Sequence, residues 1–155
     1  MKEAMIMATT VTPYLVVNGA ADAIAFYARA FGAQETMRMA EPSGRIGHAE
    51  IAIGEATIMI ADEYPERGFH GPQALGGSPV TLVLQVPDVD AVAARAVGAG
   101  AAVVIPVQDQ FYGERAGRIR DPYGHVWILS SHVEDVPSDE LQRRFTALMT
   151  EAASS

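Results

Sequence analysis

Apolar and polar positions follow one arrangement that occurs twice along the chain. Residues 12–17 and 81–86 are both rich in β-branched and apolar side chains, at an offset of 69 positions. A turn follows each run, and apolar residues then recur at helical spacing over 20–31 and about 89–97; Gly32 ends the first helix. This duplication predicts a pseudo-symmetric body with its ligand site where the two halves meet.

The remaining segments complete two equivalent halves. In the first half, strands are expected near 35–39, 48–53 and 56–61, with a two-residue turn at Gly54–Glu55 between the last two. In the second half, strands are expected at 101–105, 115–120 and 126–131. The pattern therefore predicts an α+β fold of two tandem βαβββ modules.

The chain of 155 residues is expected to form a single domain over 1–155. Module one covers about 10–62 and module two about 80–135. The linker between them, about 62–79, has four Gly and three Pro and is either a lid or a passive connection. A C-terminal helix is expected over about 138–151, capped by Ser138, and its apolar stripe predicts docking on this chain or on a second copy.

Charge and composition exclude several classes of function. The formal net charge of −8 argues against a nucleic-acid partner, because phosphates require a basic face, and it suits a cationic small molecule. The absence of Cys removes disulfides and thiol nucleophiles. The first eight residues lack the apolar stretch of a signal peptide, and no run is long enough to span a membrane. A cytoplasmic protein without a membrane partner is expected.

Two segments of the second half resemble a known superfamily. Phe111-Tyr-Gly-Glu-Arg-Ala-Gly117 and Asp121-Pro-Tyr-Gly-His-Val-Trp127, together with the paired modules, are similar to the vicinal oxygen chelate superfamily. That group includes glyoxalase I, extradiol dioxygenases, fosfomycin-resistance enzymes and bleomycin-resistance proteins. The resemblance covers about 12–135. It implies that the two modules form a cupped mixed sheet with helices on the convex side, and it implies a homodimer in which a partner can complete the cup.

The resemblance also implies where a metal ion would be bound. In the metal-dependent members, four strand positions hold one divalent ion through His and Glu, and these positions match Thr12, Met59, Thr81 and Ile128 here. Hydroxyl, thioether and alkyl side chains are poor ligands for such an ion. The sequence therefore predicts no metal and no cofactor, and it argues against glyoxalase I activity, which depends on the ion.

Side chains two residues apart share one face of a strand, which defines the lining of the expected cup. Across the Gly54–Glu55 hairpin, Glu50 is expected opposite Met59, with His48 on the same face. Glu50 is the candidate catalytic residue, as a base or a cation anchor; alternatively, it forms an exposed polar pair with His48. The residues expected to contact a ligand are Thr12, Tyr14, His48, Glu50, Met59, Thr81, Val83, Gln85, Tyr112, Arg115 and Ile128.

Several of these side chains have two interpretations. Arg115 could clamp a carboxylate or phosphate, or it could pair with Glu114 within the fold. Tyr112 could stack on a flat ligand or cover the edge of the core. In the Asp121–Gly124 turn, Asp121 is expected to cap locally, His125 to face solvent, and Trp127 to lie in the core.

Three functions remain open. The leading hypothesis is a metal-independent small-molecule binding protein, similar to bleomycin-resistance members, with a cationic or aromatic ligand in the cup. The second is a glyoxalase-like lyase or isomerase that uses Glu50 or a non-standard metal site. The third is a structural or regulatory protein with a vestigial site.

Overall fold

The computed structural model describes residues 8–154. Residues 1–7, over which the sequence predicts no signal peptide, and residue 155 lie outside this range. Module one contains β1 (Tyr14–Val17), α1 (Ala20–Phe31), β2 (Gln34–Ala40), β3 (Ile46–Ile53) and β4 (Ala56–Asp62). Module two contains β5 (Thr81–Gln85), α3 (Val89–Ala99), β6 (Ala102–Asp109), β7 (Glu114–Arg120) and β8 (Val126–His132). The α+β class with two βαβββ units is therefore confirmed.

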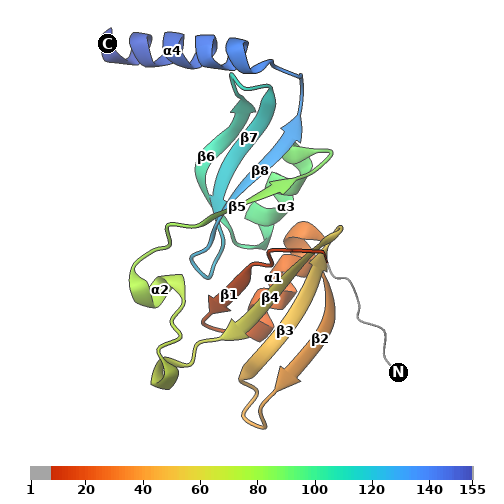
Figure 1. Cartoon of the computed structure of the whole chain (residues 1–155). Coiled ribbons are helices and arrows are strands. Elements are labelled where there is room, and N and C mark those ends of the chain that lie inside the picture. Colours follow the sequence, from red (N-terminus) through yellow and green to blue (C-terminus); the bar gives the residue numbers. More distant parts are fainter. Residues whose placement is uncertain (1–7, 155) are drawn as a thin grey trace.

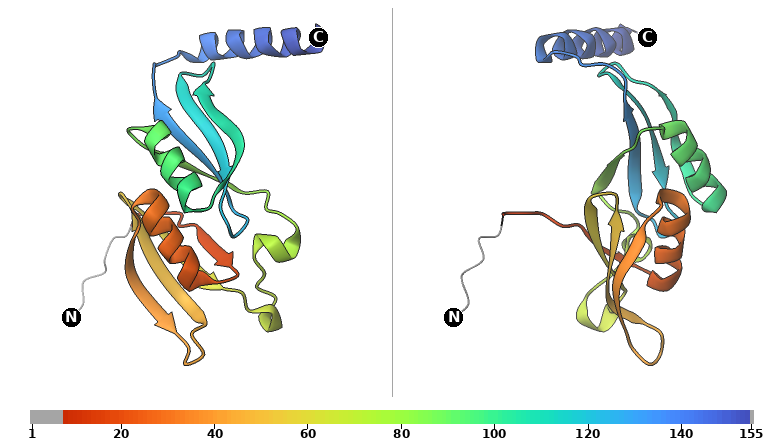
Figure 2. Two further views of the ribbon diagram at one scale, coloured as in Figure 1. Left: turned by 180° about the vertical axis from the view of Figure 1, so that it is seen from behind. Right: turned by 90° about the vertical axis from the view of Figure 1, so that its right-hand side faces the viewer.

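The strands form two four-stranded sheets, one in each module, where the sequence predicted a single cupped sheet. Their orders are β1-β4-β3-β2 and β5-β8-β7-β6, and in each sheet the first strand is parallel to the last strand of its module. The modules join mainly through α1 and α3, which lie side by side behind the sheets (Figure 1, Figure 2). The sequence predicted the number and order of the strands correctly, although β6 continues to Asp109, beyond the predicted end at 105. Strand periodicity carries no information on whether two sheets merge.

Equivalent residues cap α1 and α3, the helices of the two modules. The Asp62 carboxylate, at the end of β4, accepts hydrogen bonds from the N–H groups of Gly19 and Ala20 at the start of α1, at 3.0 and 2.8 Å. Ser131, which lies 69 positions later, accepts from the N–H of Val89 at the start of α3, at 2.9 Å. Both contacts satisfy N–H groups that have no partner inside the helix. The repeat therefore extends from the sequence pattern to individual hydrogen bonds.

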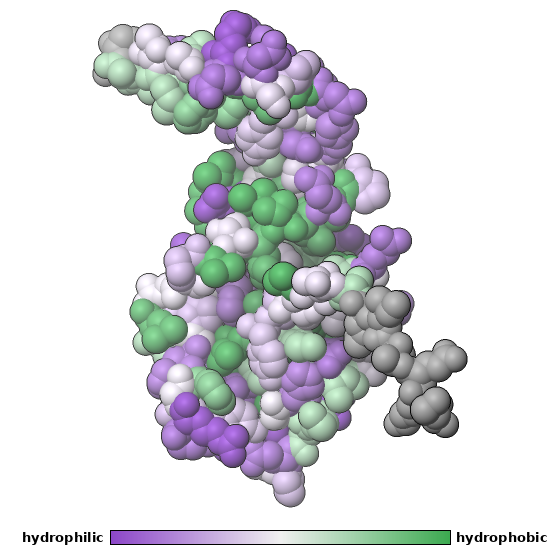
Figure 3. Space-filling view, viewed as in Figure 1, coloured by the Kyte–Doolittle hydropathy of each residue, from purple (hydrophilic) through white to green (hydrophobic). Residues whose placement is uncertain are grey.

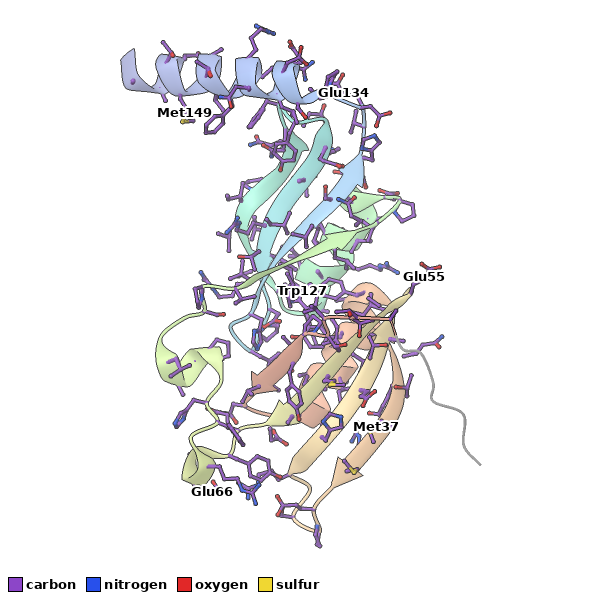
Figure 4. The ribbon with its side chains drawn as sticks, in the orientation of Figure 1. Met37, Glu55, Glu66, Trp127, Glu134 and Met149 are labelled. Carbon is purple, nitrogen blue, oxygen red and sulfur yellow. The ribbon has the colours of Figure 1, made fainter. Side chains whose placement is uncertain are left out.

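Aromatic side chains fill the junction between the modules. Tyr27 and Phe31 of α1 pack on Trp127 of β8, with ring centroids 5.5 and 4.9 Å apart, and Trp127 lies at the boundary between the modules in Figure 4. Trp127 is buried, as the sequence predicted. The buried Asp121 carboxylate accepts hydrogen bonds from the Tyr27 hydroxyl and from the Trp127 indole N–H.

The role of the Asp121–Gly124 turn is broader than the local one predicted. Asp121 does cap the turn, by accepting from the N–H groups of Tyr123 and His125. However, its bond to Tyr27 also ties module two to module one. The prediction that His125 faces solvent is wrong, because its half-buried imidazole Nε2 lies 3.0 Å from the Val16 carbonyl oxygen of β1.

The linker and the C-terminus contain more helix than the sequence indicated. The linker carries a short 3₁₀ helix, η1 (Pro65–Arg67), and α2 (Pro72–Leu75), and Gln73 donates to the Pro122 carbonyl of the turn at 2.9 Å. Helix α4 (Ser138–Ser154) begins where predicted and continues beyond 151, projecting across the far end of module two (Figure 1). Within the described residues, no helix is both long and apolar enough to cross a membrane.

Candidate functional site

The face of the first sheet that points away from α1 combines apolar and polar side chains. Alternate residues of β3 are fully buried under the helix, so His48 and Glu50 lie on the opposite face. Glu50 pairs with Met59 of β4, and Tyr14 of β1 pairs with Met59 on its other side. The register predicted from the hairpin is thus confirmed, and these four side chains share one face.

A cavity of about 770 Å³ opens at one end of this face. Tyr14 and Val16 of β1 and Ala61 of β4 line it from the sheet, while the linker adds Tyr64 and Phe69. A volume of this size is typical of small-molecule sites. The sequence analysis missed Tyr64 and Phe69 as lining residues; the only signal was that a long irregular segment often forms a binding loop.

A network of charged side chains forms the rim of the cavity. The Arg45 guanidinium lies 3.9 Å from the centre of the Tyr64 ring and forms ion pairs of 2.9 Å with both Glu41 and Glu66. Tyr64 also donates to Glu41 at 2.6 Å; this hydrogen bond and the Arg45 contact lower the pKa of Glu41. Figure 4 shows Glu66 at the linker end of the sheet. The network fixes the Tyr64 ring, which forms one wall of the cavity.

Tyr14, His48 and Glu50 form a continuous hydrogen-bonded chain. The Tyr14 hydroxyl lies 2.8 Å from His48 Nδ1, and His48 Nε2 lies 2.9 Å from Glu50 Oε2. Burial, followed by the charge of Glu50, raises the pKa of the Tyr14 phenol. The acid–imidazole pair expected from the sequence therefore exists, with Tyr14 as a third member that the sequence analysis did not join to it.

A second, shallower cavity of about 230 Å³ lies on the equivalent face of module two. Tyr112 and Ile128 line it, as does Arg118, which sequence reasoning missed. Arg118 pairs with Ile128 as Glu50 pairs with Met59, so the two halves carry opposite charges at equivalent positions. Each cavity is lined by one half of the chain, and neither described cavity spans both modules.

The other predicted ligand contacts lie outside both cavities. Arg115 binds Asp90 of α3 at 2.9 and 3.0 Å and Asp109 at 3.2 Å, so it pairs within the fold, with partners other than the expected Glu114. Its side chain points to the helix side because odd-numbered residues of β7 face that way. Thr12 precedes β1, Thr81 begins β5, and Val83 and Gln85 lie on the open face of β5 next to Ile128 and Ser130.

The metal-ligand positions implied by the resemblance do not fit a divalent ion. Thr12, Met59, Thr81 and Ile128 provide two neutral hydroxyls, one thioether and one alkyl chain, a donor set that hard and borderline cations do not favour. Met59 and Ile128 also belong to different sheets. Across residues 8–154, no cluster of three or more His, Asp or Glu side chains is arranged to hold a metal ion.

Comparison with known families agrees with this fold. The model of the Glyoxalase/Bleomycin resistance protein/Dioxygenase superfamily matches residues 6–129. The chain belongs to this superfamily. An uncharacterized protein of Mycobacterium bovis, Mb0911c, is 45% identical over 134 residues, which cover 84% of this chain and 88% of that protein.

Solved structures of similar proteins share the superfamily fold. The Arabidopsis thaliana At5g48480 gene product is 29% identical, with a TM-score of 0.65 over 80% of this chain and 99% of its own. TioX from Micromonospora is 25% identical, with a TM-score of 0.61 over 83% and 100%. The fosfomycin resistance protein FosX from Listeria monocytogenes is 16% identical, with a TM-score of 0.62 over 88% and 99%, and shows a likeness of fold alone.

Proposed function

We propose that this superfamily member is a metal-independent binding protein for a small aromatic molecule. The cavity on the first sheet is the observation that carries the proposal, because Tyr14, Tyr64 and Phe69 surround a volume sufficient for a ligand of one or two fused rings. Phe69 is 53% exposed and Tyr14 is 48% exposed. Covering such apolar surface with a ligand is favourable.

The charges around the cavity favour a cationic or neutral ligand. Three carboxylates, Glu41, Asp62 and Glu66, line it together with two arginines, Arg45 and Arg67, which gives a formal charge of −1. Arg45 is already neutralised by its two ion pairs. Glu50 adds a further negative charge on the same face. An anionic ligand would therefore meet net repulsion.

We also propose that the protein acts as a homodimer in which a second copy covers the open face of module two. Val80 directly precedes β5 and Val83 lies within it, and they are 64% and 60% exposed. Figure 3 shows a hydrophobic patch over β5 and the neighbouring strands. β1 and β5 are both edge strands with unpaired backbone groups. A second copy offers both a complementary edge and an apolar face.

A lyase or isomerase is the alternative, and the hydrogen bond between His48 and Glu50 favours it. Glu50 itself is a poor candidate for the base, because its carboxylate already accepts from His48 Nε2 at 2.9 Å. A general base must reach the proton that it removes. If the site is catalytic, the group nearest a ligand is Tyr14, which lines the cavity while His48 and Glu50 lie behind it.

Fluorescence titration with N-phenyl-1-naphthylamine, a neutral aromatic probe, tests the binding function. We expect saturable binding of one probe per chain, and Tyr14→Ala or Phe69→Ala should weaken it about tenfold, because an aromatic contact contributes on the order of 1 kcal/mol. Val97→Ala is the control, since Val97 is an exposed residue of α3 outside the cavity. The proposal fails if the probe does not saturate, or if all three variants bind it as the original chain does.

A further inference from the structure

The hydrogen-bonded chain of Tyr14, His48 and Glu50 has a direction that follows from the chemistry of its members. An ionised carboxylate can only accept hydrogen bonds, so Glu50 accepts a hydrogen bond from the N–H at His48 Nε2. A neutral imidazole then presents the lone pair of Nδ1, which accepts the hydroxyl proton of Tyr14 at 2.8 Å. The phenol oxygen of Tyr14 is left with its lone pairs free to accept a further hydrogen bond.

The placement of the three side chains makes Tyr14 the member that a ligand can reach. Tyr14 lines the cavity and is about half exposed, whereas the His48 and Glu50 side chains are only 20% and 29% exposed. Parallel pairing of β1 with β4 sets Tyr14 beside Met59, so its hydroxyl extends across β4 to His48 on β3. Tyr14, His48 and Glu50 therefore each lie on a strand of the sheet, which keeps their geometry fixed before a ligand arrives.

We propose that Tyr14 is a proton-accepting group for aromatic ligands that carry an acidic O–H or N–H, with His48 and Glu50 as positioning residues. In the full transfer, the ligand's O–H or N–H bond breaks and its proton moves to the Tyr14 oxygen. The original phenol proton passes to His48 Nδ1. The products are the deprotonated ligand, a neutral Tyr14 and an imidazolium held by the Glu50 carboxylate. The ligand thus enters the acidic cavity in its neutral or cationic form, and the positive charge gained by His48 compensates the charge that the ligand loses.

This inference deepens the proposed function, since it rests on the cavity as the ligand site and specifies the hydrogen-bonding group that the ligand must have. The neighbouring cation does not compete for the ligand's acidic group, because Arg45 is engaged by Glu41 and Glu66. Burial and the Glu50 charge raise the pKa of Tyr14, so the phenol stays protonated at neutral pH and donates its hydrogen bond to His48. A purely structural chain would instead tie β1 to β3 without any effect on a ligand.

Imidazole ¹⁵N NMR of the full-length protein tests the hydrogen-bonded chain of Tyr14, His48 and Glu50 without any ligand. The His48 signals are assigned by their loss in His48→Gln. In the neutral imidazole, we expect the proton on Nε2 and a hydrogen-bonded Nδ1 whose resonance shifts in Tyr14→Phe. Glu50→Gln should reduce the preference for the Nε2–H tautomer. A proton on Nδ1, or an Nδ1 resonance unaffected by Tyr14→Phe, would overturn the proposal.

A matched pair of probes tests proton acceptance. 2-Naphthol becomes a strong acid in its excited state and emits as naphtholate when a proton acceptor is in contact with its hydroxyl, whereas 2-methoxynaphthalene has the same rings without a donor. We expect bound 2-naphthol to emit as naphtholate in the original chain and as neutral naphthol in Tyr14→Phe. Its affinity should fall about tenfold in that variant, while the affinity for 2-methoxynaphthalene should stay within twofold.

Tyr123→Phe is the control, because Tyr123 packs on Phe26 and lines neither cavity, so it should leave both readouts unchanged. His48→Gln should suppress the naphtholate emission while 2-methoxynaphthalene still binds. If both probes bind but 2-naphthol emits only as the neutral form, the proton-accepting role is wrong and the binding function stands. If neither probe binds, the proposed aromatic site is wrong, and the NMR experiment decides the hydrogen-bonded chain by itself.

Discussion

A single buried side chain, Asp121, reinforces the junction between the two modules. Asp121 is 3% exposed, and its carboxylate accepts four hydrogen bonds: from Tyr27, Trp127 and two N–H groups of its own turn. Burial, followed by the Asp121 charge, raises the pKa of Tyr27 well above its usual value, which keeps the hydroxyl as a donor. A buried carboxylate is stable only when its acceptor positions are filled, as they are here.

Asp121→Ala should lower the free energy of unfolding by about 4 kcal/mol, because it leaves the Tyr27 hydroxyl and the Trp127 indole N–H buried without an acceptor. Tyr27→Phe, which removes one donor, should cost about 1–2 kcal/mol. Urea unfolding followed by Trp127 fluorescence measures both. Asp139→Asn, at the exposed start of α4, is the control; a loss for Asp121→Ala no larger than that of the control would contradict this account.

His132 should make a small part of the stability depend on pH. Its hydrogen bonds to Glu114 and then to Asp135 raise the pKa of the imidazole above 6.5. Because the folded pKa exceeds the unfolded one, the stabilisation is complete below about pH 6.5 and is lost as pH rises through the folded pKa. The difference in Tm between the original chain and His132→Gln should therefore shrink over that interval. A difference that is constant with pH would contradict the assignment.

At the scale of elements, the turn between β7 and β8 joins two strands and also contacts α2 of the linker. Gly124 has φ +95°, which favours glycine, and a Cβ atom placed there would lie 2.9 Å from Pro72 Cβ of α2. Gly44 provides a comparison, since it has φ +92° with open space around its Cβ position. An alanine at either position would therefore have the same backbone strain, and only the alanine at 124 would also clash with α2.

Gly44→Ala should lower stability by about 1 kcal/mol, the usual cost of a left-handed alanine. Gly124→Ala should cost about 1–2 kcal/mol more, because α2 must move away from the turn. Urea unfolding measures both variants, and limited proteolysis of the linker should accelerate only in Gly124→Ala. Equal losses of stability and equal cleavage rates would show that α2 does not rest on the turn.

At the scale of the whole molecule, the modules pack through helices and leave the other faces of both sheets open. Val83 on β5 and Ile105 on β6 are 60% and 43% exposed, and the second cavity lies beside them. Exposed apolar patches of this kind mark protein or ligand contacts. The edge strands and the apolar face of module two therefore support the homodimer proposed above.

Val83→Glu should convert the protein from dimer to monomer, because it places a charge at the centre of the proposed interface. Light scattering after size-exclusion chromatography should give twice the 16.5 kDa chain mass for the original protein and the mass of one chain for the variant. Val97→Glu, on the exposed face of α3, should remain dimeric. A monomeric original chain, or a Val83→Glu variant that stays dimeric, would contradict this interface.

The sequence allowed much of the fold and part of the site to be predicted. Alternation along β3 and β4 placed Glu50 opposite Met59, and alternation along β8 placed Trp127 in the core, because side-chain period and a two-residue turn are local properties. It missed Tyr64 and Phe69, since irregular segments have no period that tells which side chain turns inward. Arg115 had two open interpretations because either depends on where Asp90 of α3 comes to lie.

By itself, the sequence determined the two βαβββ units, the register of the hairpin at Gly54–Glu55, the helix at the C-terminus and the lack of a suitable donor set at Thr12, Met59, Thr81 and Ile128. These follow from local periodicity, turn chemistry and ligand chemistry, which need no knowledge of distant residues. Only the tertiary structure decided that the sheets stay separate, that Asp121 joins the modules, and that Tyr14 meets His48. The last two depend on contacts between residues 94 and 34 positions apart, which packing brings together and no local pattern encodes.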